Sequence, residues 1–301
     1  MILGPTAVGK TDIAIDLAQQ LHTSIISADS RQCYQEMNIG TAKPSEKELH
    51  LVKHYFINSH SVRNEVNVGE FERIALQAAA EIFRERRCAI LCGGTGLYLK
   101  AFCEGIDSMP EIPDHIRNAV REHYKKLGLT WLQQELERKD PDFFSITQER
   151  ENPQRMMRAL EVVEATGRSV LLFRTGKKQE RPFSLLKIGL SLPRDLLRER
   201  IDQRVDAMMA ASLVEEVGAL LPYRHLNALQ TVGYKEIFAY LDGHLSLEDA
   251  TEAIKTNTHR YAKRQMTWFR KDKDIHWFDA REEEQLFSFI RKTLPSDAFT
   301  S

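Results

Sequence analysis

The spacing of apolar and polar residues in the first hundred positions alternates between two patterns. Short apolar runs at 24–28 and 89–92 are interleaved with stretches at 11–21 and 70–87, in which apolar residues recur every three or four positions. The short runs are typical of buried strands and the longer stretches of amphipathic helices. Strands that alternate with helices predict an α/β fold built on a parallel sheet.

A change of pattern follows this region. A proline-punctuated segment at 109–114 leads into a helical, highly charged stretch, and a strand pattern returns at 187–192. We therefore expect a catalytic core formed by residues 1–111 and 182–301, interrupted by a helical insertion domain over residues 112–181.

Several helix boundaries within these regions can be predicted. Asn152 followed by Pro153 is a favourable helix start, and Gly167 is a favourable stop. After the returning strand, helical spacing predicts long helices at 194–221 and 247–271, and we expect the remainder of the chain to be helical.

A glycine-containing loop stands directly before the first predicted helix. It fits the pattern G-x-x-x-x-G-K-[ST] with Gly4, Pro5, Thr6, Ala7, Val8, Gly9, Lys10 and Thr11. The glycines let backbone N–H groups surround phosphate oxygens at a helix N-terminus, Lys10 adds charge, and the Thr11 hydroxyl can bind Mg²⁺. We predict a P-loop that binds a phosphate compound, which the loop alone does not specify, with Mg²⁺ as cofactor. Only three residues precede Gly4, so either the first strand is very short or the full protein begins a few residues earlier.

An acidic residue ends the strand at 24–28, whereas the strand at 89–92 ends in glycines followed by Thr95. An ordinary nucleotide-hydrolysing enzyme carries a magnesium-binding acid after such a second strand. Because the carboxyl ends of parallel strands face the ligand crevice, we expect Asp29 and Thr95 to lie near the bound phosphates. Asp29 can then act as a general base or in a magnesium shell, and its alternative role is to cap a turn.

Composition narrows the class of protein only moderately. The chain has 301 residues, of which 42% are apolar, and 42 basic residues balance 43 acidic ones. Any nucleic acid must therefore bind through local basic patches. The four cysteines form no C-x-x-C pair, and no signal peptide or membrane-spanning run is visible. We expect a cytoplasmic protein without a membrane partner.

Two predicted helices carry local basic faces. One holds Arg155 and Arg158 three positions apart, and the other interleaves basic residues with Trp268 and Phe269. Clustered arginines with aromatic residues suit phosphate contacts and base stacking on RNA. The alternative for the last helix is a solvated charged face above a core that contains Trp268. We expect both aromatic residues to be core and the RNA contacts to come from Lys263, Arg264 and Arg270.

Several motifs in one order resemble those of bacterial tRNA dimethylallyltransferases. They are GPTAxGKT at 4–11, DSxQxY at 29–34, IGTAKP at 39–44, GGTxLY at 93–98, NxQRxxRALE at 152–161, GYKE at 233–236 and AKRQxTWFR at 262–270. The resemblance covers nearly the whole chain. One departure is Ser212, which stands where the family usually has glycine.

The resemblance implies a mechanism for the matching positions. Dimethylallyl diphosphate would sit on the loop, held by Lys10 and by magnesium on Thr11, and an adenine beside the anticodon would be flipped out of its stack. Asp29 resembles the general base and Thr95 a contact near the leaving oxygen. Arg204 resembles an arginine that stabilises the released diphosphate, although its spacing alone favours a salt bridge to Asp202 or Asp206.

The same resemblance implies a set of tRNA contacts, and we expect a monomer that acts on the tRNA anticodon stem-loop. The predicted contacts are Asp29, Ser30, Arg31, Gln32, Thr95, Arg117, Gln154, Arg155, Arg158, Gly233, Tyr234, Lys235, Lys263, Arg264, Gln265 and Arg270. The alternatives are a P-loop small-molecule kinase, a prenyltransferase that acts on free adenine nucleotides, and a non-catalytic RNA-binding module. The first lacks its acid after the second strand, and the last leaves the complete loop and Asp29 unexplained.

Overall fold

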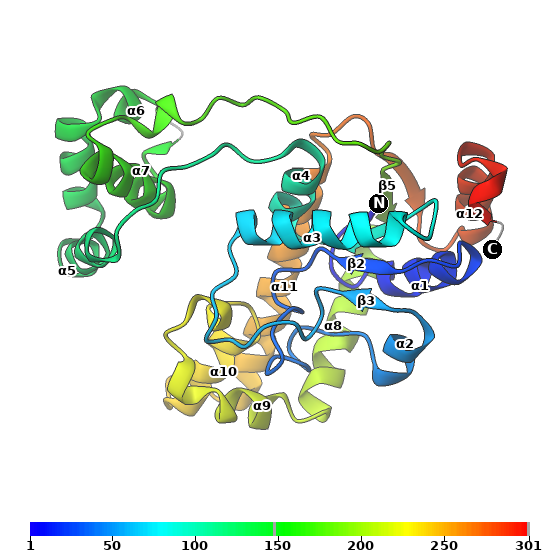
Figure 1. Cartoon of the computed structure of the whole chain (residues 1–301). Coiled ribbons are helices and arrows are strands. Elements are labelled where there is room, and N and C mark those ends of the chain that lie inside the picture. Colours follow the sequence, from blue (N-terminus) through cyan, green and yellow to red (C-terminus); the bar gives the residue numbers. More distant parts are fainter. Residues whose placement is uncertain (147–148, 300–301) are drawn as a thin grey trace. The chain divides into compact units, whose positions relative to one another are not determined.

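The computed structural model describes residues 1–146 and 149–299. The chain divides into two compact units, the second of which is coloured mostly green in Figure 1. One unit comprises Met1–Glu104 together with Arg181–Ser301, and the other Gly105–Glu180. The proline-punctuated segment at 109–114 therefore belongs to the second unit.

The first unit contains a six-stranded sheet in the order β3-β2-β4-β1-β5-β6, in which all paired strands are parallel. The α/β parallel-sheet fold expected from the sequence is confirmed. The strands are β1 Ile2–Leu3, β2 Ile25–Ser27, β3 His54–Tyr55, β4 Ile90–Gly93, β5 Ile188–Ser191 and β6 His276–Asp279. The predicted short first strand is real and central: Ile2 pairs with Cys92 on one side and with Ile188 on the other.

Helices cover both faces of this sheet because their apolar stripes pack against its buried strands. Ile13 and Leu17 of α1 and Leu286 of α12 share one apolar cluster with Ile2. Phe71 of α3 lies in a separate apolar cluster, together with residues of α4, α10 and α11. The helices of this unit are α1 Lys10–Gln20, α2 Glu46–Leu51, α3 Val68–Phe83, α4 Gly96–Glu104, α8 Arg194–Ala210, α9 Leu213–Ala219, α10 Tyr234–Leu241, α11 Leu247–Phe269 and α12 Glu283–Thr293, with short 3₁₀ turns at Leu221–Tyr223, Asn227–Leu229 and Ser296–Phe299.

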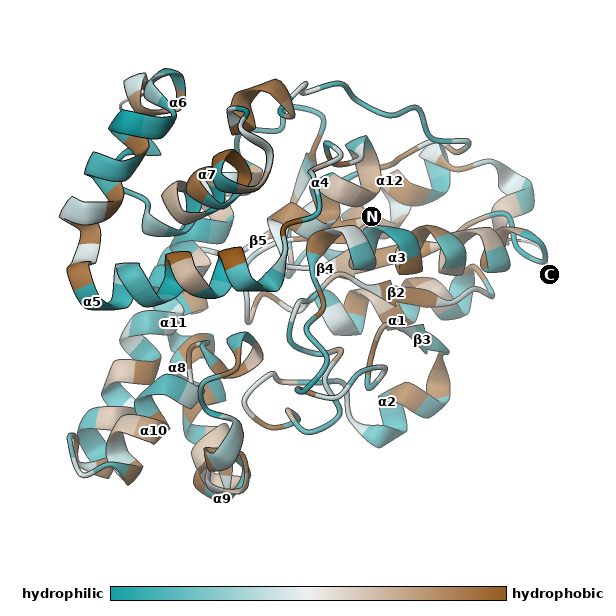
Figure 2. Cartoon of the chain, turned by 60° about the vertical axis from the view of Figure 1, so that its left-hand side comes forward, coloured by the Kyte–Doolittle hydropathy of each residue, from teal (hydrophilic) through white to brown (hydrophobic). Residues whose placement is uncertain are grey.

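Two expectations for the C-terminal half were wrong. The single helix expected at 194–221 is two helices, because Ser212 between α8 and α9 adopts a left-handed conformation with φ of 71° and ends the helical path. The region after α11 is not all helical, since β6 adds an edge strand to the sheet beside β5. Figure 2 shows that α8, α10 and α11 each carry hydrophobic patches between hydrophilic ones, as helices packed on one side do.

The second unit is helical, as expected for this part of the chain. It contains α5 Asp114–Lys139, α6 Pro141–Ser145, α7 Pro153–Thr166 and a 3₁₀ turn at Val170–Leu172. The predicted boundaries of α7 are confirmed: the Asn152 side chain accepts a hydrogen bond from the Arg155 N–H, and Gly167 ends the helix with φ of 69°. Leu132, Leu136 and Met156 form part of the core of this unit.

Candidate active site

The glycine-containing loop connects β1 to α1 and is fixed from the far end of the chain. Gln265 of α11 is 6% exposed; its Oε1 accepts from the Thr6 N–H at 2.9 Å, and its Nε2 donates to the Gly94 carbonyl at 2.9 Å. Its amide therefore ties the loop to the end of β4. The tRNA contact predicted for Gln265 disagrees with this arrangement, because the side chain is buried and both ends of its amide are engaged.

A cavity of about 280 Å³ opens beside this loop within the first unit. It brings together the loop, the carboxyl ends of β2 and β4, and helices α8 and α11. Its lining is Thr6, Ala7, Gly9, Lys10, Thr11, Asp12, Asp29, Gln32, Thr41, Ala42, Lys43, Pro44, Glu48, Cys92, Gly93, Gly94, Arg204, Tyr261 and Gln265. The predicted catalytic residues Asp29 and Arg204 thus meet at the predicted phosphate loop.

Three members of the predicted diphosphate-binding set lie outside this lining. The Val8 side chain is fully buried in the apolar cluster around α1. Gly4 has φ of 154°, and a Cβ there would lie 2.7 Å from the Leu190 carbonyl oxygen, so the loop can leave β1 only with a glycine at this position. The Pro5 carbonyl accepts a hydrogen bond from Lys10 Nζ at 2.7 Å. These residues shape the loop, and the lining comes from Thr6, Ala7 and the segment from Gly9 to Thr11.

Two of the three cations that line the cavity, Lys10 and Arg204, have no carboxylate partner in the described part of the chain. Burial lowers the pKa of Lys10 to about 8 and also lowers the pKa of Arg204. Arg204 Nη1 lies 3.5 Å from the Thr6 hydroxyl, to which it donates. Uncompensated positive charge in a partly buried cavity favours an anionic ligand there.

The salt bridges that spacing alone favours for Arg204 are not formed. Asp202 lies 2.8 Å from Nε2 of His259 on α11, and Asp206 lies 2.8 Å from Nζ of Lys255 on the same helix. Asp202 and Asp206 therefore hold α8 against α11, and the Arg204 side chain lines the cavity without pairing to either of them.

Asp29 shows both of the features that its position at a strand end suggested. Its Oδ1 accepts from the Arg31 N–H at 2.9 Å and from the Gln32 N–H at 3.3 Å, which caps the turn after β2. Its Oδ2 makes no hydrogen bond within the described residues. One oxygen thus holds the carboxylate in place and leaves the other able to accept a proton.

Thr95 is close to Asp29 in the fold but is not part of the cavity lining. Its Oγ1 accepts from the Ser30 N–H at 3.1 Å and donates to the Ser30 Oγ at 3.4 Å. Burial, with a smaller contribution from the charge of Asp29, raises the pKa of Tyr261, which lines the cavity from α11, to about 12. The predicted contact between Thr95 and the leaving oxygen stays a prediction.

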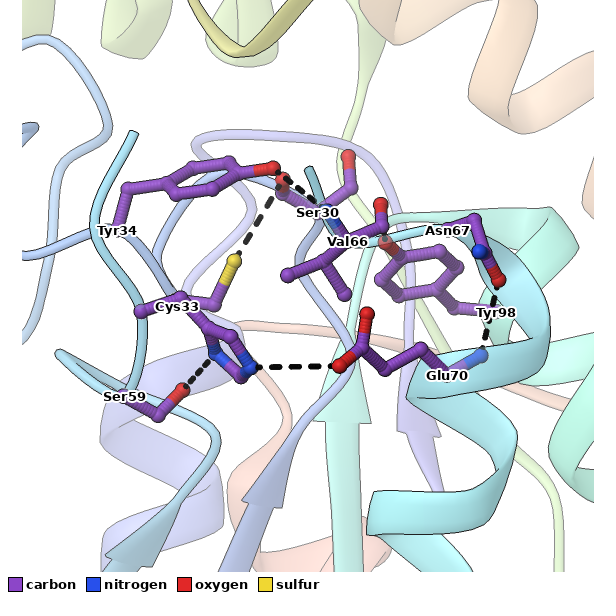
Figure 3. A network of polar contacts seen from close by, with 9 residues as sticks. Ser30, Cys33, Tyr34, Ser59, Val66, Asn67, Glu70 and Tyr98 are labelled. Atoms are coloured by element: carbon purple, nitrogen blue, oxygen red, sulfur yellow. Dashed lines mark hydrogen bonds and ion pairs between the residues drawn. The ribbon is translucent and has the colours of Figure 1, made fainter. Parts of the chain in front are cut away.

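A layer of buried polar contacts supports the turn that carries Asp29 to Gln32 (Figure 3). Cys33 Sγ donates to the Ser30 carbonyl at 3.9 Å. The Tyr34 hydroxyl accepts from the Val66 N–H, and the Tyr98 hydroxyl donates to the Val66 carbonyl, both at 3.4 Å. These contacts hold the backbone of the turn in place, and the backbone in turn positions the side chains of Asp29 and Gln32.

Sequence reasoning missed part of the lining. Tyr261 lies one helical turn before Gln265 on the same face of α11, a spacing that could have revealed it. The segment from Thr41 to Pro44 belongs to the IGTAKP motif, to which no role had been assigned. Asp12 and Glu48 belong to none of the motifs identified in the sequence, so no pattern predicted that they line the cavity.

The residues present fit a magnesium ion that binds together with a diphosphate. Among the described residues no group of three or more His, Cys, Asp or Glu side chains forms a metal cluster. Mg²⁺ usually takes only one or two carboxylates, with water and substrate phosphates as its other ligands. Thr11, Asp12 and Glu48 line the cavity, and burial, followed by the repulsion of Glu48, raises the pKa of Asp12. A cation would relieve that repulsion.

The residues predicted to contact tRNA from the first unit divide into two groups. Lys235, Lys263, Arg264 and Arg270 are exposed, whereas Tyr234 is fully buried and donates its hydroxyl hydrogen to Glu216 Oε1 at 2.6 Å. Gly233 is also buried, and its N–H donates to Glu236. In this structure Gly233 and Tyr234 are covered, so the tRNA contacts predicted for them stay predictions that their burial does not favour.

The two aromatic residues of α11 expected in the core differ. Phe269 is 3% exposed, which confirms the prediction, but Trp268 is 40% exposed, so its placement in the core was wrong. A Cβ on Gly96 would lie 2.3 Å from the Trp268 ring, so one edge of the indole packs on the start of α4. The remainder of the indole is open to solvent.

The second unit holds the other predicted tRNA contacts. Gln154 and Arg155 are exposed, and Arg117 is half-buried. Arg155 forms an ion pair with Glu149 at 3.0 Å, and Arg158 forms one with Glu161 at 3.5 Å. The basic face expected on α7 is thus partly neutralised by carboxylates of its own unit.

Comparison with known proteins identifies the family. A model of the IPP transferase family matches residues 32–272. This chain belongs to the IPP transferase family. The matched range begins after the phosphate loop, but individual relatives extend over it. The tRNA dimethylallyltransferase of Cytophaga hutchinsonii is 44% identical over 294 residues, which are 98% of this chain and 96% of that protein.

Other members of the IPP transferase family agree. The tRNA dimethylallyltransferase 1 of Bacteroides thetaiotaomicron is 43% identical over 97% of this chain and 94% of that protein. A crystal structure of tRNA isopentenylpyrophosphate transferase from Bacillus halodurans has a TM-score of 0.71 at 35% identity, with coverage of 97% of this chain and 94% of that one. A structure of a eukaryotic dimethylallyltransferase acting on tRNA has a TM-score of 0.76 at 25% identity. The match covers 98% of this chain and 78% of that chain. The family and the enzyme class predicted from the sequence are confirmed. No helix among the described residues is long and apolar enough to cross a membrane.

Proposed function

We propose that this enzyme transfers a dimethylallyl group from dimethylallyl diphosphate to the exocyclic N6 amine of the adenine 3′ of the anticodon, position 37 of tRNA, and releases diphosphate. The observation that carries the proposal is the single cavity in which Lys10 and Arg204, without carboxylate partners in the described residues, face Asp29 and Gln32. The cations suit a diphosphate, and the carboxylate and amide suit an adenine. The names of the relatives support the same reaction.

The donor half of the reaction uses the phosphate loop. Backbone N–H groups at the start of α1 and the Lys10 ammonium bind the diphosphate. As the bond between the allylic carbon and the diphosphate oxygen breaks, the electron pair stays on the diphosphate, and Arg204 stabilises the added negative charge. Magnesium would supply further charge neutralisation, held by the Thr11 hydroxyl with Asp12 or Glu48.

The acceptor half needs the adenine outside its stack, because its N6 is otherwise not accessible to the donor. The N6 lone pair forms the new bond to the allylic carbon, and Asp29 Oδ2 takes the proton that N6 loses. Gln32 contacts the edge of the base from the cavity wall. In this proposal Thr95, which is held next to Ser30, contacts the diphosphate near its leaving oxygen.

The tRNA backbone is held by basic and polar side chains that are exposed or half-buried. In the first unit these are Ser30, Arg31, Lys235, Lys263, Arg264 and Arg270, and in the second Arg117, Gln154, Arg155 and Arg158. Such contacts release counterions, so they make binding depend on salt even though the net charge is only −1. The monomeric state and the cytoplasmic location stay predictions.

A transfer assay tests the proposal. Labelled dimethylallyl diphosphate is offered with an anticodon stem-loop or with free AMP, and ATP is offered separately as a phosphate donor. We expect label only in the stem-loop, and none when the adenine beside the anticodon is replaced. Label on AMP would favour the nucleotide prenyltransferase, and phosphate transfer from ATP the kinase.

A substitution separates chemistry from binding. Asp29→Ala removes the general base, so we expect the single-turnover rate to fall about 10²–10⁴-fold while tRNA affinity stays within about twofold of wild type. Rapid-quench kinetics and filter binding measure the two quantities. Asp16→Ala, an exposed position on α1, is the matched control. An equal loss of rate and affinity in Asp29→Ala contradicts the general-base role.

A further inference from the structure

Glu216 of α9 is an acceptor for four hydrogen bonds, none of which the proposed chemistry uses. Its Oε2 accepts from the backbone N–H groups of Asn38 and Ile39, both at 2.8 Å. Its Oε1 accepts from the Gly40 N–H at 3.0 Å and from the Tyr234 hydroxyl at 2.6 Å. One carboxylate thus binds three consecutive amides and one phenol, and charge-assisted bonds of this kind are the strong ones.

The segment that Glu216 holds, Asn38 to Lys43, is called here the anchored loop. The Tyr234 ring packs directly on it, since a Cβ on Gly40 would lie 2.6 Å from the ring. At its other end, Lys43 Nζ donates to Asn38 Oδ1 at 2.9 Å and to Asn58 Oδ1 at 2.6 Å. The anchored loop is therefore fixed at both ends.

The anchored loop in turn orients a side chain of the cavity. Gln32 Nε2 donates to the carbonyls of Thr41 and Ala42, at 3.3 and 3.2 Å. Gln32 Oε1 accepts from the Ser27 hydroxyl at 3.2 Å. Rotating this amide by half a turn would put Oε1 against two carbonyl oxygens. Both Nε2 hydrogens are used, while Oε1 keeps one lone pair, so Gln32 offers the cavity an acceptor and no donor.

We propose, on the basis of the function above, that Glu216 and Tyr234 are positioning residues that select the acceptor base. By fixing the anchored loop they keep Gln32 as an acceptor. A base that presents an exocyclic amine then finds a partner, whereas a purine with a carbonyl at the same place meets a second acceptor. This gives the buried Tyr234 of the GYKE motif a role that does not require it to touch RNA.

The test compares two stem-loops that differ in one base. The adenine stem-loop gives kcat and KM for transfer. The same stem-loop with hypoxanthine, which has a carbonyl in place of the amine, is titrated as a competitive inhibitor to give KI. We expect KI divided by KM to be at least about tenfold for the wild type, the cost of opposing two buried acceptors.

Three variants should change this ratio, and one should not. Tyr234→Phe keeps the ring on Gly40 and removes one hydrogen bond. Glu216→Gln places an amide donor against the backbone N–H donors of the anchored loop. Gln32→Met removes the acceptor in the cavity itself. We expect each to lower the ratio, to within about threefold of unity for Gln32→Met and Glu216→Gln. Glu215→Gln, the exposed neighbour on α9, should leave it unchanged.

The outcomes separate the inference from the function on which it rests. Tyr234→Phe is expected to stay folded, which its melting temperature verifies, so it decides the matter even if Glu216→Gln is unstable. A Tyr234→Phe ratio equal to that of the wild type, with kcat and KM unchanged or altered in parallel, overturns the inference alone. Absence of transfer by the wild-type enzyme to the adenine stem-loop overturns the proposed function and this inference with it.

Discussion

The cations of the cavity and the arginines of α7 are equally basic in the sequence but differ in the structure. Lys10 and Arg204 have no carboxylate partner in the described residues, and burial lowers the pKa of each. Arg155 and Arg158 are paired with Glu149 and Glu161. The first pair of charges is a cost to the free protein that an anionic ligand removes, and the second is already compensated. The location of uncompensated charge, more than the number of basic residues, thus indicates where an anion binds.

The largest effect should come from Lys10→Met. We expect transfer to fall by about 10³-fold, because a contact to the departing diphosphate is lost. The melting temperature of the ligand-free protein at pH 7 should rise. The pKa of Lys10 is lowered on folding, so the folded state binds this proton more weakly than the unfolded state, and the charged lysine costs stability below about pH 8. Lys100→Met, an exposed control on α4, should change neither quantity. A lower melting temperature for Lys10→Met would show that its charge is compensated after all.

The same lysine predicts how donor affinity depends on pH. A bound diphosphate favours protonated Lys10, so binding requires no proton uptake below about pH 8 but must take one up above it. Below pH 8 the titration of Lys10 should not change the affinity for a non-hydrolysable donor analogue. Above pH 8 it should lower the affinity by up to about tenfold per pH unit. Calorimetry in buffers of different ionisation enthalpy measures the proton uptake.

Lys43 is the second group to control in this experiment. It also lines the cavity, and burial lowers its pKa to about 8. Because its ammonium is already held by carbonyl and amide oxygens, Lys43→Gln should keep the proton uptake, and Lys10→Gln should lose it. The reverse result would assign the titration to Lys43 and contradict the prediction for Lys10.

A smaller effect should distinguish the exposed arginines of the two units. Arg264→Ala should reduce the slope of log K against log salt for tRNA binding by about one, as expected for one lost phosphate contact. Arg155→Ala should reduce it less, because Glu149 already neutralises part of its charge. Filter binding between low and moderate salt gives both slopes. Equal slopes would mean that Arg155 leaves Glu149 when tRNA binds.

The smallest effect involves no charge and separates stability from electrostatics. Ser212 adopts φ of 71°, a conformation that costs a residue with a Cβ about 1 kcal/mol or more relative to glycine. Ser212→Gly should therefore raise the free energy of unfolding by about 0.5–1 kcal/mol without changing transfer, as urea denaturation and the transfer assay can show. Ser296→Gly, away from this junction, is not expected to stabilise. A destabilised Ser212→Gly protein would mean that the hydroxyl has a role that its contacts do not explain.

Patterns that depend on neighbouring residues were predictable from the sequence. Helical spacing located α1, α3 and α11, and the phosphate motif located the loop before α1. Helical spacing did not reveal the break at Ser212, because Leu213 and Val217 continue the apolar spacing of α8. The only sign in the sequence was the glycine that the family usually has at this position. An amphipathic pattern reports which side of a helix is buried, not whether the chain stays helical.

The site assignments that burial does not favour have a shared physical origin. Tyr234 and Gln265 are polar residues in specific motifs, which favoured an exposed contact with RNA. Their burial depends on residues far away in the chain: Gly40 leaves room for the Tyr234 ring, and Thr6 and Gly94 take up the Gln265 amide. A sequence pattern does not say which distant backbone a polar side chain satisfies.

The central position of β1 has a consequence for how the enzyme is made. This strand is synthesised long before its neighbour β5, which begins only at Ile188, and the bond from Thr6 to Gln265 spans 259 residues. The nascent chain must therefore carry its phosphate loop unclosed through most of synthesis, including the whole of the second unit. Closure over such a separation is slow compared with local helix formation. Assembly of the active site thus cannot precede the synthesis of α11, and a chain that terminates before α11 contains the phosphate motif without a complete active site.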